Sequence, residues 1–352
     1  MVKPRRVPDW ETIRIFLEVV RNGSFRAAAE KLGQSINALR RKVDGIEHGL
    51  GVILLTRHVD GVRATAEGER IYDAALRMEA ASFDLLRARN ASQKDVEGEV
   101  RLAVTEGLGT FWLAPRLVEF QRANPKLMVN LTCEARCADL MRLEADVSVQ
   151  RQRPVASDLK MLKLGCMHLM FFAAKSYLDT YGVPETISDL QRHRLVVQSD
   201  DDIRWRELYD RLFPGLPPVG FVSLRSNVSS AHYWSIAKGA GIGMLPTYAQ
   251  AIGAPLVPIH LGVVQPIEIW MSYHPEAKRI ARVKRTIDWI TEAFNPQHFP
   301  WFRDEFIHPT KLAEVYRGEP LVNALFAGYG AAPFFEEENL RADLKSATAA
   351  AK

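Results

Sequence analysis

The chain has 352 residues, more than one compact domain needs and enough for two or three. Hydrophobic residues make up 47% and charged residues 25%, which excludes a disordered or collagen-like chain, and no apolar run approaches the roughly 18 residues of a membrane helix. Three cysteines and the lack of a visible secretory signal lead us to expect a cytoplasmic protein without a disulfide framework.

The net charge of +4 is unevenly distributed along the chain. Residues 1–65 hold 12 Lys and Arg against 7 Asp and Glu, whereas the remaining residues hold 34 against 35. Positive charge concentrated at one end is typical of a small nucleic-acid-binding domain joined to a neutral body.

Three apolar stripes at helical spacing follow one another at the start of the chain. Asp9, Ser24 and Ser35 are the expected N-caps of three helices, and Gly23 and Gly33 are expected to end the first two. The polar face of the third helix carries Asn37, Arg40, Arg41, Asp44 and His48. Two short helices joined by a tight glycine turn, with a basic face on the second, predict a helix-turn-helix.

A hairpin and a long helix are expected next. Asp60-Gly61 favours a tight turn between two strands, and Thr65 suits the N-cap of the helix. The apolar positions of this helix are Ile71, Ala75, Met78 and Leu85 or Leu86. Because this stripe is too narrow to be covered by one domain, we interpret residues 67–97 as a linker helix that pairs with a second copy; an intrachain core is the alternative.

Many positions of this N-terminal part form one pattern in fixed register, namely Asn22-Gly23-Ser24-Phe25-Arg26-Ala27-Ala28-Ala29-Glu30-Lys31-Leu32-Gly33, Arg41, Glu47, Leu50-Gly51-Val52, Arg57, Gly61, Arg63, Thr65 and Gly68. This pattern resembles the winged helix-turn-helix of the LysR-type transcriptional regulators. The match runs from Asp9 to about Met78, and the chain to about Phe294 is similar in layout to the family's effector domain. The resemblance implies a bacterial homodimer or homotetramer that binds double-stranded DNA at an inverted-repeat operator, with RNA polymerase as a possible partner.

The recognition helix departs from the family's usual Ser-Gln-Pro-Thr-Val-Ser, since this chain has Ser35-Ile36-Asn37-Ala38-Leu39-Arg40. Asn37 suits adenine and Arg40 suits guanine, whereas Ile36 either contacts a thymine methyl group or belongs to the core. Because Asp60 would repel phosphate, we expect the wing contacts from Arg57, His58 and Arg63. The expected DNA-binding residues are Ser24, Arg26, Ser35, Ile36, Asn37, Ala38, Arg40, Arg41, Arg57, His58 and Arg63. Lys3, Arg5 and Arg6 form either an arm on DNA or a loose tail.

The body of the chain alternates between strand-like and helix-like segments, which predicts an α/β fold with a mostly parallel sheet. The expected strands are 100–104, 127–132, 146–149, 169–174, 195–198, 221–224, 242–245 and 267–272. The expected helices are 112–123, 138–144, 175–181, 204–212, 229–238 and a last one through 280–294. In all, we expect a winged helix-turn-helix over 1–66 and a two-lobe, periplasmic-binding-protein-like effector domain over 98–295, with lobe I at about 98–170 and 266–295 and lobe II at about 171–265.

Ligands of such sheets bind at the carboxyl ends of strands, near helix N-termini. The residues expected to bind the effector are Thr105, Gly107, Gly109, Arg136, Gln150, Arg151, Ser199, Asn227 and Ser229. Hydroxyl groups, helix N-termini and Arg136 or Arg151 suit a small, carboxylate-like anion, whereas Glu106 and Asp200 argue against a highly charged one.

Other patterns do not predict chemistry. Gly239-Ala240-Gly241-Ile242-Gly243 follows a helix and precedes a strand, the reverse of a dinucleotide fingerprint, so we interpret it as a helix end and a site of close packing. Cys133 and Cys137 lack further zinc ligands nearby and are interpreted as buried or idle thiols, a redox sensor beside Arg136 being the alternative. We therefore expect no enzyme, no cofactor and no metal site. The alternative function is an effector-independent repressor or architectural protein with a closed cleft.

The last 57 residues, 296–352, extend beyond the usual end of the family. They hold nine aromatic residues, namely Phe299, Trp301, Phe302, Phe306, Tyr316, Phe326, Tyr329, Phe334 and Phe335. Since this is not a disordered composition, we expect 299–335 to pack on its own effector domain or on a neighbouring subunit, and 340–352 to fray.

Overall fold

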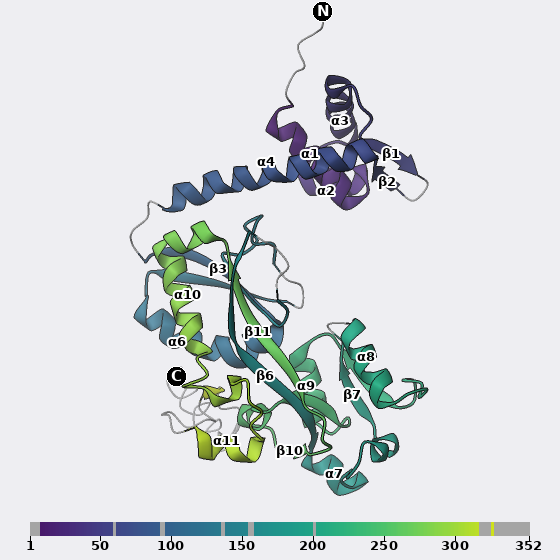
Figure 1. Cartoon of the computed structure of the whole chain (residues 1–352), viewed down its shortest axis with the longest axis vertical. Coiled ribbons are helices and arrows are strands. Elements are labelled where there is room, and N and C mark those ends of the chain that lie inside the picture. Colours follow the sequence, from purple (N-terminus) through teal and green to yellow (C-terminus); the bar gives the residue numbers. More distant parts are fainter. Residues whose placement is uncertain are drawn as a thin grey trace, which may run out of the picture. The chain divides into compact units, whose positions relative to one another are not determined.

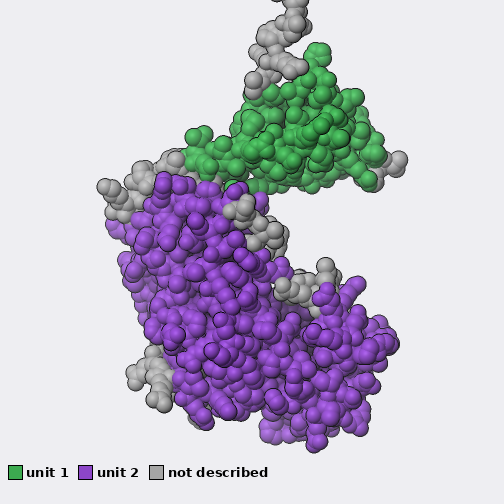
Figure 2. All heavy atoms as spheres, viewed as in Figure 1, with its two compact units in different colours: residues 1–92, 141–143 green, residues 93–140, 144–352 purple. Residues whose placement is uncertain are grey.

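A computed structural model of the chain describes residues 8–58, 61–91, 96–134, 138–153, 158–199, 202–316 and 325–326. The chain divides into two compact units, residues 1–92 with 141–143 and residues 93–140 with 144–352 (Figures 1 and 2). Within the described ranges, no helix is long and apolar enough to cross a membrane.

The first unit opens with three helices, α1 (Trp10–Asn22), α2 (Phe25–Leu32) and α3 (Ile36–Leu50). All three predicted N-caps are confirmed, because the side chains of Asp9, Ser24 and Ser35 accept hydrogen bonds from backbone N–H groups in the first turns. Gly23 and Gly33 take left-handed φ angles of 57° and 62° and end α1 and α2 as expected.

The expected hairpin consists of β1 (Leu55–His58) and β2 (Gly61–Ala64), paired antiparallel, while Asp60 lies outside the described residues. Val62 N donates to Gly23 O at 2.7 Å, and a Cβ atom at Gly61 would lie 2.5 Å from the same oxygen. The hairpin can therefore dock this closely on the turn between α1 and α2 only because residue 61 has no side chain. Gly68 N donates to Thr65 Oγ1 at 2.9 Å, which confirms Thr65 as the cap of α4 (Ala66–Ala91).

The apolar stripe of α4 divides into two parts. Ile71 and Ala75 pack into the core around Phe16 and Leu17, as an intrachain core requires. Further along the helix, Met78 is 40%, Leu85 74% and Leu86 47% exposed. The exposed half of the stripe is the part that a second copy would have to cover.

The main sheet of the second unit has the strand order β10-β6-β11-β5-β3-β4, with β9 also paired to β6. Its strands are β3 (Gly98–Val104), β4 (Leu127–Cys133), β5 (Val147–Gln150), β6 (Lys160–Ala174), β9 (Gly243–Pro246), β10 (Leu256–Ile259) and β11 (Gln265–Tyr273). Only β3 pairs in parallel, with β4 and β5, so the prediction of a mostly parallel sheet is wrong. The reason is that the chain crosses between the lobes along β6 and returns along β11, so these two long strands run antiparallel, side by side (Figure 1).

Lobe II also has a short parallel pair, β7 (Leu195–Gln198) and β8 (Val222–Ser226). The remaining helices are α5 (Glu106–Leu108), the π-helix η1 (Gly109–Leu113), α6 (Ala114–Ala123), α7 (Lys175–Tyr181), α8 (Asp202–Leu212), α9 (Ser229–Ala237), α10 (Ala281–Ala293) and α11 (Pro309–Val315). The described residues also form the short 3₁₀ helices η2 (Ser188–Arg192), η3 (Ala249–Ile252), η4 (Pro275–Arg279) and η5 (Pro300–Phe302).

Two local predictions have opposite outcomes. The helix expected over 138–144 is wrong, because this stretch forms turns and Leu143 has a φ of 58°, which no right-handed helix contains. The interpretation of Gly239–Gly243 is confirmed, since Gly239 follows α9 with a φ of 83° and a Cβ atom at Gly241 would lie 2.3 Å from Arg194 O.

The described part of the C-terminal extension belongs to the core of the second unit. Trp112 is fully buried, and its ring centroid lies 5.0 to 6.4 Å from those of five phenylalanine and tryptophan rings: Phe294, Phe299, Trp301, Phe302 and Phe326. A Cβ atom at Gly165 of β6 would lie 2.5 Å from Phe302 O, so the extension lies directly on that strand. Packing of the extension on its own domain is thus confirmed for 299–316 and 325–326. Tyr329, Phe334, Phe335 and 340–352 lie outside the described residues.

Candidate functional site

The outer face of α3 displays the polar side chains that the sequence indicated. Asn37, Arg40 and Arg41 are exposed, whereas Ile36 is partly buried against the core around Leu39. The Arg40 guanidinium lies 5.7 Å from the centroid of the Phe25 ring, which steadies the stem of this side chain on α2. Arg26 of α2 is exposed and pairs with Glu30 at 3.3 Å. The hydroxyl groups of Ser24 and Ser35 are engaged as helix caps, and Ala38 is partly buried.

The hairpin presents its cations on two different faces. Thr56 pairs with Arg63, and Arg57 pairs with Val62. Because side chains alternate along a strand, His58 and Arg63 share one face and Arg57 shares the other with Val62, which packs against the core. The three expected wing residues are all exposed, but they do not point the same way.

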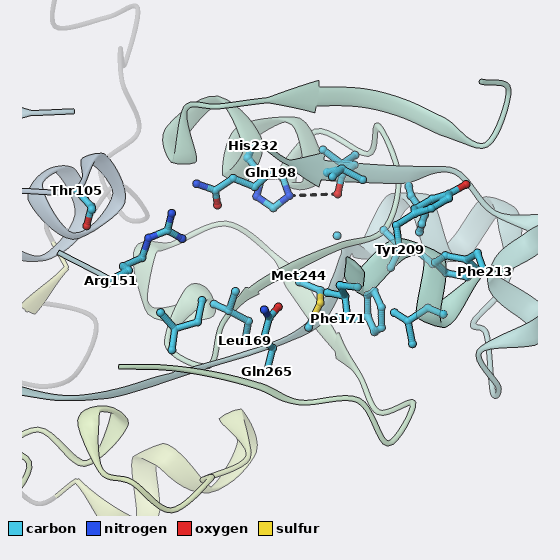
Figure 3. A pocket seen from close by; sticks show the side chains of 18 of the residues that line it. Thr105, Arg151, Leu169, Phe171, Gln198, Tyr209, Phe213, His232, Met244 and Gln265 are labelled. Carbon is cyan, nitrogen blue, oxygen red and sulfur yellow. Dashed lines mark hydrogen bonds between the residues drawn. The ribbon is translucent and has the colours of Figure 1, made fainter. Parts of the chain in front are cut away.

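A pocket of about 170 Å³ lies between the two lobes of the second unit (Figure 3). It is lined by Thr105, Gln150, Arg151, Gln152, Leu169, Phe171, Leu195, Val196, Val197, Gln198, Leu208, Tyr209, Leu212, Phe213, His232, Ile242, Gly243, Met244, Gln265 and Ile267. Thr105 and Arg151 lie at one end, and Tyr209 and Phe213 lie at the other, beyond Met244. The pocket thus has a polar end at lobe I and an apolar, aromatic end within lobe II.

The polar end has unused hydrogen-bonding capacity. Among the described residues, the buried atoms Thr105 Oγ1 and Gln150 Oε1 have no hydrogen-bond partner. Arg151 is the one charged side chain in the described lining. Since buried polar groups are almost always satisfied, two orphaned atoms beside a cation point to a bound polar molecule.

His232 contributes a neutral ring to this pocket. It is 2% exposed, its Nε2 lies 3.2 Å from Val196 O, and burial lowers its pKa to about 4. The imidazole is therefore uncharged at neutral pH, and Arg151 supplies the positive charge of the described lining.

A smaller cavity of about 40 Å³ adjoins the pocket. The two share Thr105, Arg151, Leu169, Gln198, His232 and Met244. Gly107, Ser229, Tyr233 and Tyr248 are further lining residues of the smaller cavity. Gln198 Nε2 donates to Ser229 Oγ at 2.6 Å, so the amide and the hydroxyl group are already oriented.

Five of the expected effector-binding residues come together here, Thr105, Gln150 and Arg151 at the pocket and Gly107 and Ser229 at the smaller cavity. The described lining does not include Gly109, Ser199 or Asn227. A Cβ atom at Gly109 would lie 2.4 Å from Cys133 Sγ, and Ser199 N donates to Ser226 O at 2.8 Å. Arg136 and Asp200 lie outside the described residues.

Sequence reasoning missed Gln198, His232 and the aromatic end of the pocket. Signals for the first two were present, because Gln198 ends a predicted strand directly before Ser199 and His232 lies one helical turn after Ser229. The aromatic end brings together Phe171 of β6 with Tyr209 of α8 and Phe213 just after that helix, and these segments are far apart in sequence.

Neither of the two described cysteines, Cys133 and Cys166, has an activated thiol. Burial raises the pKa of the Cys133 thiol, with Glu106 adding to the effect, and burial also raises that of Cys166. This disfavours the thiolate that a redox sensor needs. Cys137 lies outside the described residues, and within those described no three His, Cys, Asp or Glu side chains are grouped to hold a metal ion.

Two family models match successive parts of the chain. Residues 10–69 match the model of the bacterial regulatory helix-turn-helix protein, lysR family, and residues 93–295 match the LysR substrate binding domain. The chain is 25% identical over 301 residues to the HTH-type transcriptional regulator DmlR of Escherichia coli (strain K12), covering 84% of this chain and 97% of that protein.

A second relative, an HTH-type transcriptional regulator of Xanthomonas campestris pv. campestris (strain 8004), is 33% identical over 186 residues, which span 53% of this chain and 54% of that protein. The crystal structure of ArgP from Mycobacterium tuberculosis has a TM-score of 0.51 at 18% identity, covers 80% of this chain and 97% of that one, and shows a shared fold. With its helix-turn-helix and its two-lobe effector-binding domain, the chain belongs to the LysR family of bacterial transcriptional regulators.

Proposed function

We propose that the chain is a cytoplasmic, sequence-specific regulator that responds to a small carboxylate bound between its lobes. Residues 1–66 bind DNA, residues 67–97 dimerise, and residues 98–295 bind the effector. The observation that carries the effector proposal is the polar end of the pocket, where Arg151 accompanies the orphaned hydroxyl group of Thr105. The orphaned acceptor Gln150 Oε1 suits a hydrogen-bond donor elsewhere on the effector.

The lining suggests the chemistry of the effector. A guanidinium binds a carboxylate through charge-assisted hydrogen bonds, and the Thr105 hydroxyl group is a suitable second donor. The opposite end, with Phe171, Tyr209 and Phe213, suits a hydrocarbon or aromatic body. A cavity of roughly 150 Å³ holds benzene, so the present volume of about 170 Å³ suits a molecule about the size of one ring.

On the DNA side, Asn37 and Arg40 are the proposed base contacts, and Arg41, Arg57, His58 and Arg63 are proposed to bind phosphates. Met78, Leu85 and Leu86 are proposed to pair α4 with a second copy in a homodimer or homotetramer, which gives the inverted-repeat operator its symmetry. Contact with RNA polymerase at the promoter would follow from binding there.

The proposal is tested by selecting bound sequences from random duplex DNA with the full-length protein over a salt series. An enriched inverted repeat with steep salt dependence supports the DNA half, whereas salt-sensitive binding without any enriched motif contradicts base reading by α3. For the effector half, a panel of small carboxylates is screened for a rise in melting temperature. Failure of the whole panel would favour effector-independent regulation.

A further inference from the structure

Glu106 of lobe I reaches the first turn of α9 in lobe II. Its Oε2 accepts a hydrogen bond from Ser230 N at 3.0 Å, and its Oε1 accepts one from the Thr110 hydroxyl at 3.1 Å. Ser230 is the second residue of α9, so its N–H is one of the donors that no carbonyl of the helix itself can satisfy. The helix dipole further favours a negative charge at this point.

The two lobes approach each other closely beside this hydrogen bond. A Cβ atom at Gly107 would lie 2.9 Å from both Cβ and Oγ of Ser229. The two lobes can approach this closely only because residue 107 is glycine and has no Cβ atom. Gly107 and Ser229 both line the smaller cavity, and Thr105, the neighbour of Glu106 in sequence, lines both cavities. The contact therefore lies at the rim of the effector pocket.

We infer that Glu106 is a latch that holds lobe I against the first turn of α9. Its carboxylate takes the place at the helix N-terminus that an anionic group of the effector would otherwise find. The one negatively charged group of the effector then binds at Arg151. A second negatively charged group is excluded from the N-terminus of α9, because Glu106 already occupies it. The restriction on effector charge rests on the proposed function, whereas the latch itself does not.

The latch is tested by hydrogen exchange of the full-length chain without effector or DNA. Glu106→Ala removes the acceptor, so the Ser230 amide should exchange at least about tenfold faster than in the wild type, the effect expected for losing a hydrogen bond to a charged group. Glu106→Gln keeps the shape and an acceptor oxygen but no charge, and should be intermediate. Glu99→Ala is the matched control, because Glu99 is exposed in the same lobe and accepts a hydrogen bond from Asn130 Nδ2 at 2.9 Å.

Wild-type exchange at Ser230 in the Glu106→Ala protein would overturn the latch, and if that variant does not fold, Glu106→Gln decides. The charge restriction is tested by the rise in melting temperature with benzoate and with phthalate. The preference for benzoate over phthalate should fall about tenfold in Glu106→Ala, and an unchanged preference would overturn the restriction. Failure of the proposed function would instead leave the wild type without any carboxylate-induced rise, a result that does not touch the exchange measurement.

Discussion

The ring of Phe326 stacks on the ring of Tyr248, with centroids 4.8 Å apart and planes inclined by 20°. Tyr248 also lines the smaller cavity beside the pocket, and its hydroxyl group donates to Met167 Sδ at 3.5 Å. The C-terminal extension thus packs directly on a residue of the cavity wall, and a substitution that loosens the extension is expected to change the shape of the cavity through Tyr248.

Phe302→Ala should destabilise the second unit by about 3 to 5 kcal/mol. The side chain is fully buried and its ring lies 5.1 Å from Trp112 and 4.9 Å from Phe294, so truncation leaves a cavity in the aromatic core. Urea unfolding followed by tryptophan fluorescence measures the loss. Val315→Ala, on a residue of the same extension that is 37% exposed, should change stability by less than about 0.5 kcal/mol. Equal losses would show that the core packing is not the cause.

Glu79→Ala should cost the first unit roughly 3 kcal/mol. Glu79 is 5% exposed and accepts two hydrogen bonds from the Arg21 guanidinium, at 2.9 and 2.5 Å, so its removal leaves a half-buried cation without its main partner. Thermal unfolding is the measurement. Glu67→Ala, which removes an exposed pair with Arg70, is the control, and a loss as large as that of Glu79→Ala would contradict the argument.

Arg40→Ala and Arg57→Ala should differ in what they change. Loss of the proposed base contact at Arg40 is expected to cost about 1 to 3 kcal/mol at the operator and to relax the sequence preference. Loss of the proposed phosphate contact at Arg57 should weaken binding to all sequences and reduce the salt slope by about one. Titrations of operator and random duplex at several salt concentrations separate the two. Equal losses on both duplexes by both variants would contradict this division.

Arg151→Ala should weaken carboxylate binding roughly thirtyfold, which corresponds to about 2 kcal/mol for a hydrogen bond to a charged group. The rise in melting temperature with benzoate should shrink accordingly. Arg192→Ala removes an exposed guanidinium that pairs with Asp189 on the surface of the same unit, and it should leave the benzoate response unchanged. A full response in Arg151→Ala would mean that the carboxylate binds elsewhere.

His232 should make the second unit less stable in mild acid. Burial depresses its folded pKa to about 4 from an ordinary 6.5, so between these values the unfolded chain takes up a proton that the folded chain does not. Its contribution is fully present above pH 6.5 and falls by about 1.4 kcal/mol per pH unit as the pH is lowered towards 4. From pH 6.5 to 5, the wild type should lose about 2 kcal/mol more than His232→Gln in urea unfolding. Parallel pH profiles would refute this assignment.

Local features of the fold were predictable because they depend on neighbouring residues. Asp9 caps α1 through the N–H of Thr12, three residues on, and Gly23 ends that helix through its own φ, so both can be identified from a short stretch of sequence. The expected helix over 138–144 failed for the opposite reason. Leu140 and Ala145 are buried against Ala103 of β3, and this distant contact holds the chain in turns despite its helix-like spacing.

The same distinction applies to the candidate site. Thr105 and Arg151 were predictable because each follows a strand end, where α/β proteins bind ligands. The antiparallel pairing of β6 with β11 and the aromatic end of the pocket were not predictable, because both depend on which distant segments meet. Phe171 and Tyr209, for example, share no local pattern in the sequence.

The glycine at position 165 bears on how the C-terminal extension evolved. A side chain at this position would collide with the backbone of Phe302, so the extension can settle on β6 only where residue 165 is glycine. Relatives that carry a comparable aromatic extension should therefore have glycine at the equivalent position, whereas relatives that end after their last helix are free to vary there. The residue type at the position equivalent to 165, compared across many aligned relatives, would then show in which lineages the extension was gained.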